Sequence, residues 1–136
     1  VKNLTLGSWK AQKQPFYSWG VSYSKEYEVK SLSTPYSVQL NDWKGTLAEV
    51  YVNDQKAGII AYDPYRLDIT PYLKEGKNKV DVRVIGSHKN LLGPHYRHPA
   101  PGLASPWHWK NIDKQIPGSE YQMMDYGLMT DFDLVH

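Results

Sequence analysis

The sequence has no cysteine, only two phenylalanines and no apolar run long enough to span a membrane. The lack of cysteine excludes disulfide bridges and zinc sites built from thiolates. Sixteen basic and fourteen acidic residues leave a net charge of +2, so the chain lacks a basic surface suited to neutralising phosphates. No apolar segment of the signal-peptide kind is present, and because the chain begins with Val1 we expect a mature fragment or an excised domain. These absences predict that neither a nucleic acid nor a membrane is a partner.

Tyrosine and tryptophan are abundant where phenylalanine is scarce. Eleven Tyr and five Trp occur in 136 residues, a length typical of one domain. Both side chains combine an apolar ring with a polar group, which suits half-exposed surfaces that bind ligands. Tyrosine is also a good strand former. The composition therefore permits two interpretations of these rings, a ligand-binding surface or ordinary strands.

Apolar and polar residues alternate in several short segments. In residues 21–29 the side chains of Val21, Tyr23, Tyr27 and Val29 fall on one face, and serines and glutamates fall on the other. A period of two is typical of a half-buried strand. At least seven such strands at regular spacing predict an all-β, antiparallel β-sandwich without a long amphipathic helix. The further predicted strands are residues 36–40, 47–52, 56–62, 65–69, 79–85 and 128–135.

Turn signals separate these strands. Asn53 and Asp54 follow residues 47–52 and can adopt the positive φ of a tight hairpin turn. Thr70 is predicted to cap a brief helical turn that has Pro71 at its first position. Gly76 fits the left-handed position that ends such a turn.

Residues 48–84, AEVYVNDQKAGIIAYDPYRLDITPYLKEGKNKVDVRV, resemble the galactose-binding-like jelly-roll accessory domain of bacterial glycoside hydrolases of the β-galactosidase and β-glucuronidase kind. Asp54 replaces the usual turn glycine. The C-terminal part, which includes KNLLGPHY and MMDYGLMTDFDL, is similar to the ends of α-L-rhamnosidase-like hydrolases. The positions that match the family pattern are Val50, Val52, Asn53, Gly58, Tyr65, Asp68, Ile69, Thr70, Leu73, Gly76, Asn78, Val82 and Val84.

The resemblance implies a jelly-roll domain attached to the catalytic domain of a parent hydrolase, in the bacterial periplasm or outside the cell. The matching residues have structural roles, since Asp68 and Thr70 can accept hydrogen bonds from backbone N–H groups at the corner that follows the predicted strand 65–69. A fold does not prescribe a function. We therefore expect no catalytic residue among them and predict that the isolated chain is not an enzyme.

Residues 86–127 have no clear periodicity. Loops of more than about 15 residues are uncommon in compact domains and are usually functional or disordered. Because the segment is rich in Trp, Tyr, Leu and Met, we expect an ordered excursion that packs on its own sandwich or on a neighbouring domain. The prediction for the whole chain is thus a single β-sandwich domain at 1–136 with one long excursion.

Metal sites and acid–base pairs have little support in the sequence. His95 and His98 have a spacing that could ligate a metal, but zinc needs three or four ligands and no cysteine is available. We therefore predict no cofactor, with a structural calcium ion on Asp42, Asp63 and Asp125 as the alternative. No carboxylates occur in a pattern that marks a glycosidase pair, which disfavours a stand-alone glycosidase.

Loop aromatics are the strongest candidates for a functional site. Indole and phenol rings pack on the C–H faces of sugars while nearby polar groups bind the hydroxyls. The favoured function is a non-catalytic module that packs on the catalytic domain or binds a glycan. The alternative is a scaffold without glycan affinity, whose rings are buried in a domain interface. The predicted site comprises Trp43, Tyr62, Tyr65, Tyr96, Trp107 and Trp109, with His95 and His98 as polar partners.

Overall fold

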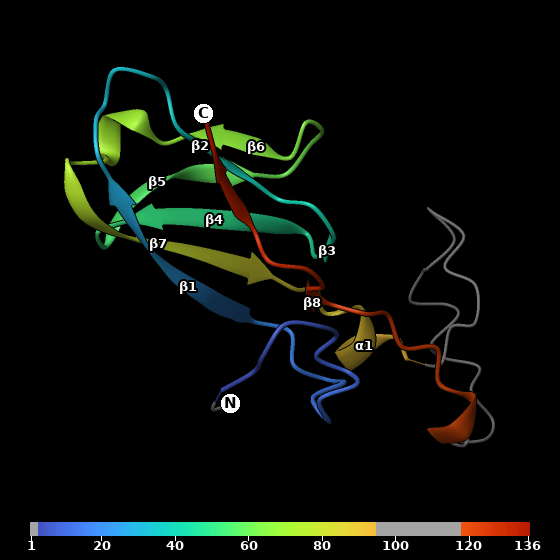
Figure 1. Cartoon of the computed structure of the whole chain (residues 1–136). Helices are drawn as coiled ribbons and strands as arrows, with labels where there is room; N and C mark the ends of the chain where they lie inside the picture. The colour runs from blue at the N-terminus through green and yellow to red at the C-terminus, as the bar shows by residue number, and fades with distance from the viewer. Residues whose placement is uncertain (1–2, 95–117) are drawn as a thin grey trace.

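The structure, a computed structural model, describes residues 3–94 and 118–136 and consists almost entirely of β-strands (Figure 1). The helical elements in this part of the chain are α1 (Lys89–Leu92) and the 3-10 turns η1 (Thr70–Tyr72) and η2 (Gly118–Glu120), all of them short. None of these is long and apolar enough to cross a membrane. The strands are β1 (Gly20–Val29), β2 (Ser37–Gln39), β3 (Trp43–Lys44), β4 (Leu47–Val52), β5 (Gln55–Ile60), β6 (Arg66–Asp68), β7 (Gly76–Ile85), β8 (Gly127–Leu128) and β9 (Asp133–Val135).

The strands form antiparallel sheets that pack as a jelly-roll β-sandwich. The larger sheet has the order β1-β7-β4-β5, and a three-stranded sheet has the order β6-β2-β9. Strands β3 and β8 form a separate pair. Figure 1 shows the three-stranded sheet lying over the four-stranded one. The sandwich predicted from the alternation is confirmed.

The period-two alternation places the core between the two larger sheets. Val50 of β4 and Val82 of β7 are directly paired and fully buried, while Glu49 lies on the outer face. Val38 and Phe132 close the core from the other side. Burying each aliphatic side chain of this kind contributes about 1.5–3 kcal/mol, so the two valine-rich strands anchor the fold.

The predicted turn geometry is largely confirmed. Asn53 and Asp54 have φ values of 50° and 67°, as the hairpin between β4 and β5 requires. Gly76 has a φ of 90° where the chain enters β7. The predicted helix cap is wrong, because Ile69 occupies the N-cap position of η1 and makes no capping side-chain bond. Thr70 is the first residue of the turn itself.

Thr70 instead forms hydrogen bonds across the corner at which β6, η1 and the segment before β2 meet. Its Oγ1 accepts a hydrogen bond from the backbone N of Tyr36 at 2.7 Å and donates to Asp68 Oδ1 at 2.6 Å. The same carboxylate oxygen accepts from Thr70 N at 2.9 Å. The corner roles expected for Asp68 and Thr70 are therefore confirmed, and they link η1 to the segment that enters β2.

The predicted closing strand at 128–135 is divided into β8 and β9. Met129 N and Thr130 N both donate to the carbonyl of Asp42, at 2.9 and 3.1 Å, which turns the chain between the two strands. Leu128 and Phe132 are both buried on either side of this turn. One continuous strand is excluded because the chain changes from the β3 pair to the β2 sheet here.

The N-terminal segment and the ends of the predicted excursion meet beside β8. Trp9 is buried, and its Nε1 donates to Tyr23 Oη at 2.9 Å. The described parts of the excursion are residues 86–94 and 118–127, and Gln122 N donates to Pro94 O at 2.8 Å. Pro94 and Gln122, which stand on either side of residues 95–117 in the sequence, therefore lie next to each other.

Candidate functional site

A pocket of about 390 Å³ lies where β3, the segment before β6 and residues 124–126 meet. Three aromatic residues line it, of which Tyr126 is buried, together with two carboxylates, one lysine and the exposed side chain of Met124. The residues that define it are Asp42, Trp43, Lys44, Tyr65, Met124 and Asp125. The candidate site therefore combines segments that are far apart in the sequence.

Trp43 and Tyr65, both predicted from the sequence, form the aromatic wall. Their ring centroids are 5.4 Å apart at an interplanar angle of 86°, an edge-to-face arrangement that fixes both rings. Trp43 is held by the pairing of β3 with Leu128, and Tyr65 by its carbonyl, which accepts from Leu40 N at 2.9 Å. A Cβ atom at Gly45 would lie 3.1 Å from the Trp43 ring and 2.9 Å from a backbone oxygen, so glycine permits this close packing.

The other predicted site residues are not gathered here. Tyr62 is 85% exposed and does not line the pocket, although its neighbour Ala61 does. The five remaining candidates lie outside the described residues, and their role stays a prediction: His95, Tyr96, His98, Trp107 and Trp109.

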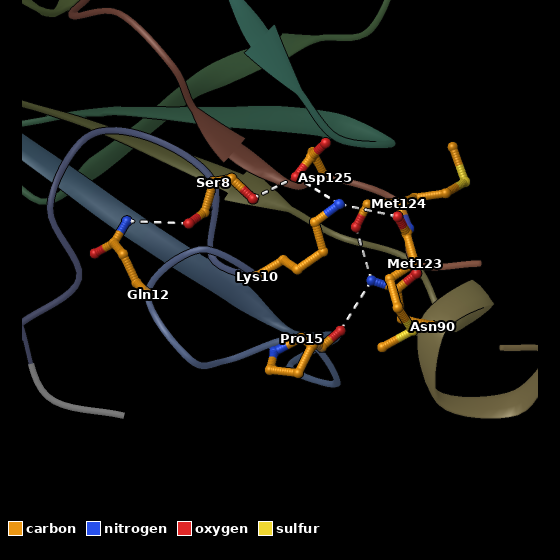
Figure 2. Close-up of polar contacts among 8 residues, drawn as sticks. All are labelled: Ser8, Lys10, Gln12, Pro15, Asn90, Met123, Met124 and Asp125. Carbon is orange, nitrogen blue, oxygen red and sulfur yellow. Dashed lines mark hydrogen bonds and ion pairs between the residues drawn. The ribbon is translucent and has the colours of Figure 1, made fainter. Parts of the chain in front are cut away.

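Asp125 supplies a fixed anionic group to the pocket. Ser8 Oγ donates to its Oδ1 at 2.5 Å, and Lys10 Nζ lies 3.2 Å from the same oxygen (Figure 2). The Ser8 hydrogen bond is the main cause that lowers the pKa of Asp125 below its ordinary value of 3.8, and Lys10 and Lys44 act in the same direction. The carboxylate is therefore ionised near neutral pH and acts as a hydrogen-bond acceptor, since a general acid needs a raised pKa.

The wall that carries Asp125 is held by a buried asparagine. Asn90 is 2% exposed, and its Nδ2 donates to Pro15 O and Met124 O, both at 2.8 Å. Its Oδ1 accepts from Met124 N, also at 2.8 Å. Figure 2 shows these bonds beside that from Lys10 Nζ to Met123 O, which is 3.1 Å long. We call these contacts of Asn90, Lys10, Ser8 and Asp125 the latch.

Sequence reasoning missed the latch. Asn90 stands in a segment without periodicity, and nothing in its surroundings marks it as buried. The sequence marks Asp125 as a conceivable calcium ligand and as one of several acidic residues without a glycosidase motif, but not as part of the pocket. The described residues contain no group of three or more acidic or histidine side chains that could hold a metal ion, so Asp63 is not gathered with Asp42 and Asp125.

Comparisons with known proteins show which proteins this chain is similar to. No protein-family model matches the sequence. A "Putative beta-glucuronidase" of Formosa agariphila is 32% identical over 93 residues, which are 64% of this chain and 8% of that protein. The chain thus spans less than a tenth of the relative's length.

Solved structures share the fold. A rhamnosidase from Novosphingobium sp. PP1Y superposes with a TM-score of 0.61 at 23% identity, over 88% of this chain and 11% of that one. A β-D-mannosidase from Dictyoglomus thermophilum superposes with a TM-score of 0.52 at 20% identity, over 93% of this chain and 17% of that one. The chain is therefore similar in sequence to a small part of a putative beta-glucuronidase and has the fold of β-domains within large glycoside hydrolases, which confirms the resemblance found in its sequence.

Proposed function

We propose that this domain is a non-catalytic accessory module of a glycoside hydrolase and that it binds a glycan in the pocket beside Trp43 and Tyr65. The observation that carries the proposal is the pairing of these two fixed rings with the ionised carboxylate of Asp125 in one hollow. Aromatic rings accept the apolar faces of sugars, and carboxylates accept hydrogen bonds from sugar hydroxyls. The volume of about 390 Å³ falls within the usual range for small-molecule sites.

Two observations support a non-catalytic role. The lowered pKa of Asp125 suits an acceptor and not the acid of a glycosidase pair. The chain also corresponds to only 8% of the similar putative beta-glucuronidase, which leaves room for a catalytic domain elsewhere in such a protein. In this proposal the partner is the catalytic domain of a parent hydrolase. The parent protein acts in the periplasm or outside the cell, where its polysaccharide substrates are found.

Domain packing is a second candidate function, favoured by exposed apolar side chains around the latch. Leu91 and Leu92 of α1 are 49% and 64% exposed, and Phe16 and Met124 are 45% and 47% exposed. Phe16 and Leu91 directly follow Pro15 and Asn90 in the sequence, and Met124 bonds Asn90 directly, so the backbone segments that carry these side chains meet at Asn90. A cluster of this kind is typical of a surface that contacts another domain.

Affinity electrophoresis and calorimetry with a panel of soluble plant and algal polysaccharides test the glycan proposal. We expect one polysaccharide to bind and Trp43→Ala to weaken binding by about tenfold or more, the equivalent of ~1.4 kcal/mol, because a stacking ring is lost. Tyr62→Ala is the matched control, since that ring is exposed outside the pocket.

Three results would contradict the proposal in different ways. Binding by none of the polysaccharides would favour the packing role. Equal affinities of the Trp43→Ala variant and the original chain would exclude the pocket. Turnover of aryl glycosides by the chain would overturn the non-catalytic assignment.

A further inference from the structure

The outer face of the four-stranded sheet has a second hollow that shares no residue with the pocket of Trp43 and Tyr65. It is a groove of about 490 Å³ between side chains of β1, β4 and β7. The residues that line it and enter the argument are Ser22, Ser24, Tyr51, Lys79, Asp81 and Arg83. We propose that this groove is a second carbohydrate site and that it binds a neutral oligosaccharide.

The groove exists because short and long side chains alternate across the sheet. Ser22 and Ser24 of the edge strand β1 are paired with Arg83 and Asp81 of β7. Tyr51 of β4 stands opposite Asp81 on the next strand. The serines leave a low strip along β1 that is bounded on one side by the longer side chains of β7 and β4, so an extended ligand can lie along β1.

An exposed indole lies at the end of this strip. Trp19, directly before β1, is 64% exposed, and the Arg83 guanidinium lies 5.9 Å from the centre of its ring. A Cβ atom at Gly20 would come within 2.4 Å of Arg83 Nε, so the glycine leaves room for the arginine to extend over the backbone of β1. Glu49 Oε2 holds the guanidinium from the other side at 3.6 Å from Nη1. The ring and the arginine therefore lie side by side and together form a platform.

The polar groups of the groove are mixed donors and acceptors. Asp81 is 8% exposed, accepts a hydrogen bond from Ser24 Oγ and lies 3.0 Å from Lys79 Nζ. Tyr51 Oη donates to Glu49 Oε2 at 3.3 Å and marks the far wall. Hydroxyl groups of a sugar both donate and accept, so this mixture can serve them without moving a buried charge.

The charge of the groove identifies the class of sugar. Two acidic residues, Asp54 and Asp81, are matched by two basic ones, Lys79 and Arg83. The groove thus has no net charge with which to attract an acidic polysaccharide, and its basic groups already have carboxylate partners. A neutral chain loses no charge–charge energy on entering it. The ligand class is therefore a neutral oligosaccharide whose ring packs on Trp19.

Titration of the ¹⁵N-labelled chain, followed by amide chemical shifts, tests this site. The probes are cellohexaose, xylohexaose and mannohexaose, with hexagalacturonate as the acidic comparison. We expect a neutral hexasaccharide to shift the amides of residues 22–24 and 81–83. Trp19→Ala is expected to weaken that binding at least tenfold, and Ser22→Gln, which fills the strip, is expected to have a similar effect.

Two matched variants separate this site from the pocket. Ile59→Ala removes an exposed apolar side chain from the same sheet outside the groove and should leave the affinity unchanged. Trp43→Ala should also leave the shifts of residues 22–24 unchanged, so the proposal does not depend on the pocket. It is wrong if no neutral hexasaccharide shifts these amides, if only hexagalacturonate does, or if both Trp19→Ala and Ser22→Gln bind normally.

Discussion

The two ends of the sandwich are held together by different kinds of contact. Where β7 begins, Asn78 bonds to Lys74 and Gly76, which are close in sequence, and to Asn53 in the hairpin turn. The hydrogen bonds of Asp68 and Thr70 lie just before this point of the chain, and we call all of these contacts together the corner. Where β7 stops, the latch joins Pro15, Asn90 and Met124, so its bonds cross 75 and 34 positions of the chain.

This difference shows what each end needs in order to form. The corner is largely assembled from residues close in sequence, so a local motif can specify it once β4 and β7 pair. The latch forms only after three distant segments have been brought together, so loop closure must precede its hydrogen bonds. We therefore expect changes at the corner to affect the whole fold and changes at the latch side chains to act locally.

The largest effect is expected from the glycine at which the N-terminal segment packs against β8. A Cβ atom at Gly127 would lie 2.6 Å from the carbonyl oxygen of Gly7, and the φ of Gly127 is +132°. We expect Gly127→Ala to lower the free energy of unfolding in urea by about 4 kcal/mol, because a backbone clash adds to conformational strain.

Gly76 is the matched position at the corner. Its φ is +90°, but the nearest atom to an added Cβ, Glu28 Oε1, is 4.0 Å away. Gly76→Ala should therefore cost only the strain of about 1–2 kcal/mol. Equal costs at Gly127 and Gly76 would mean that the N-terminal segment does not pack against β8 as described.

At the corner, Asn78→Ala is expected to lower the free energy of unfolding by about 3 kcal/mol, since it removes a buried polar side chain and leaves backbone groups of Lys74 and Gly76 without their hydrogen-bond partners. Asn78 is 1% exposed and takes part in four hydrogen bonds. Gln55→Ala, at an exposed position of the same hairpin, is the control and should stay within about 0.5 kcal/mol of the original chain.

At the latch, Asn90→Ala is expected to act locally. The amide of Met124 loses its acceptor, so its hydrogen exchange should become at least about tenfold faster while the exchange of β7 amides changes little. Asn41→Ala removes bonds to Asp131 and Asp133 on the surface and should leave the Met124 amide protected. A uniform loss of protection over β7 in the Asn90→Ala variant would show that the latch is part of the global folding unit.

The smallest effect concerns pH. The Ser8 hydrogen bond and Lys10 lower the pKa of Asp125 in the folded state, so its contribution to stability is present above its ordinary pKa of 3.8 and is lost as the pH falls through the lower folded value. Protection of the latch amides should therefore decrease below about pH 4 and depend less on pH in Asp125→Asn. Asp68 at the corner also has a lowered pKa, caused by Thr70, so Asp68→Asn should flatten the acid response of the corner amides alone.

Much of the fold could be predicted because its signals are local. Val80, Val82 and Val84 alternate with polar residues and are all buried as expected. The helix cap was predicted wrongly because Thr70 has a better partner in the backbone of Tyr36, 34 positions away. The break between β8 and β9 was missed for a similar reason, since the carbonyl of Asp42 that turns the chain is distant in sequence.

The candidate site was predictable only in part. Trp43 and Tyr65 could be selected by residue type, because exposed rings near turns suit sugar binding. Their contact with each other, and the position of Asp125 beside them, depend on the pairing of β3 with β8 and on the latch. Residue type can identify a candidate ligand-binding side chain, but it cannot identify the neighbours that orient it.

The sequence by itself determined which residues face the core and where the chain turns, since a strand period of two and the φ preferences of Asn53, Asp54 and Gly76 are properties of adjacent residues. Only the tertiary structure decided which ends meet, which carboxylate has its pKa lowered by a neighbouring serine and where the sheets leave a hollow. These features depend on distances between segments up to 117 positions apart, as between Ser8 and Asp125. No local preference encodes such a distance, because it is the sum of every turn and pairing between the two residues.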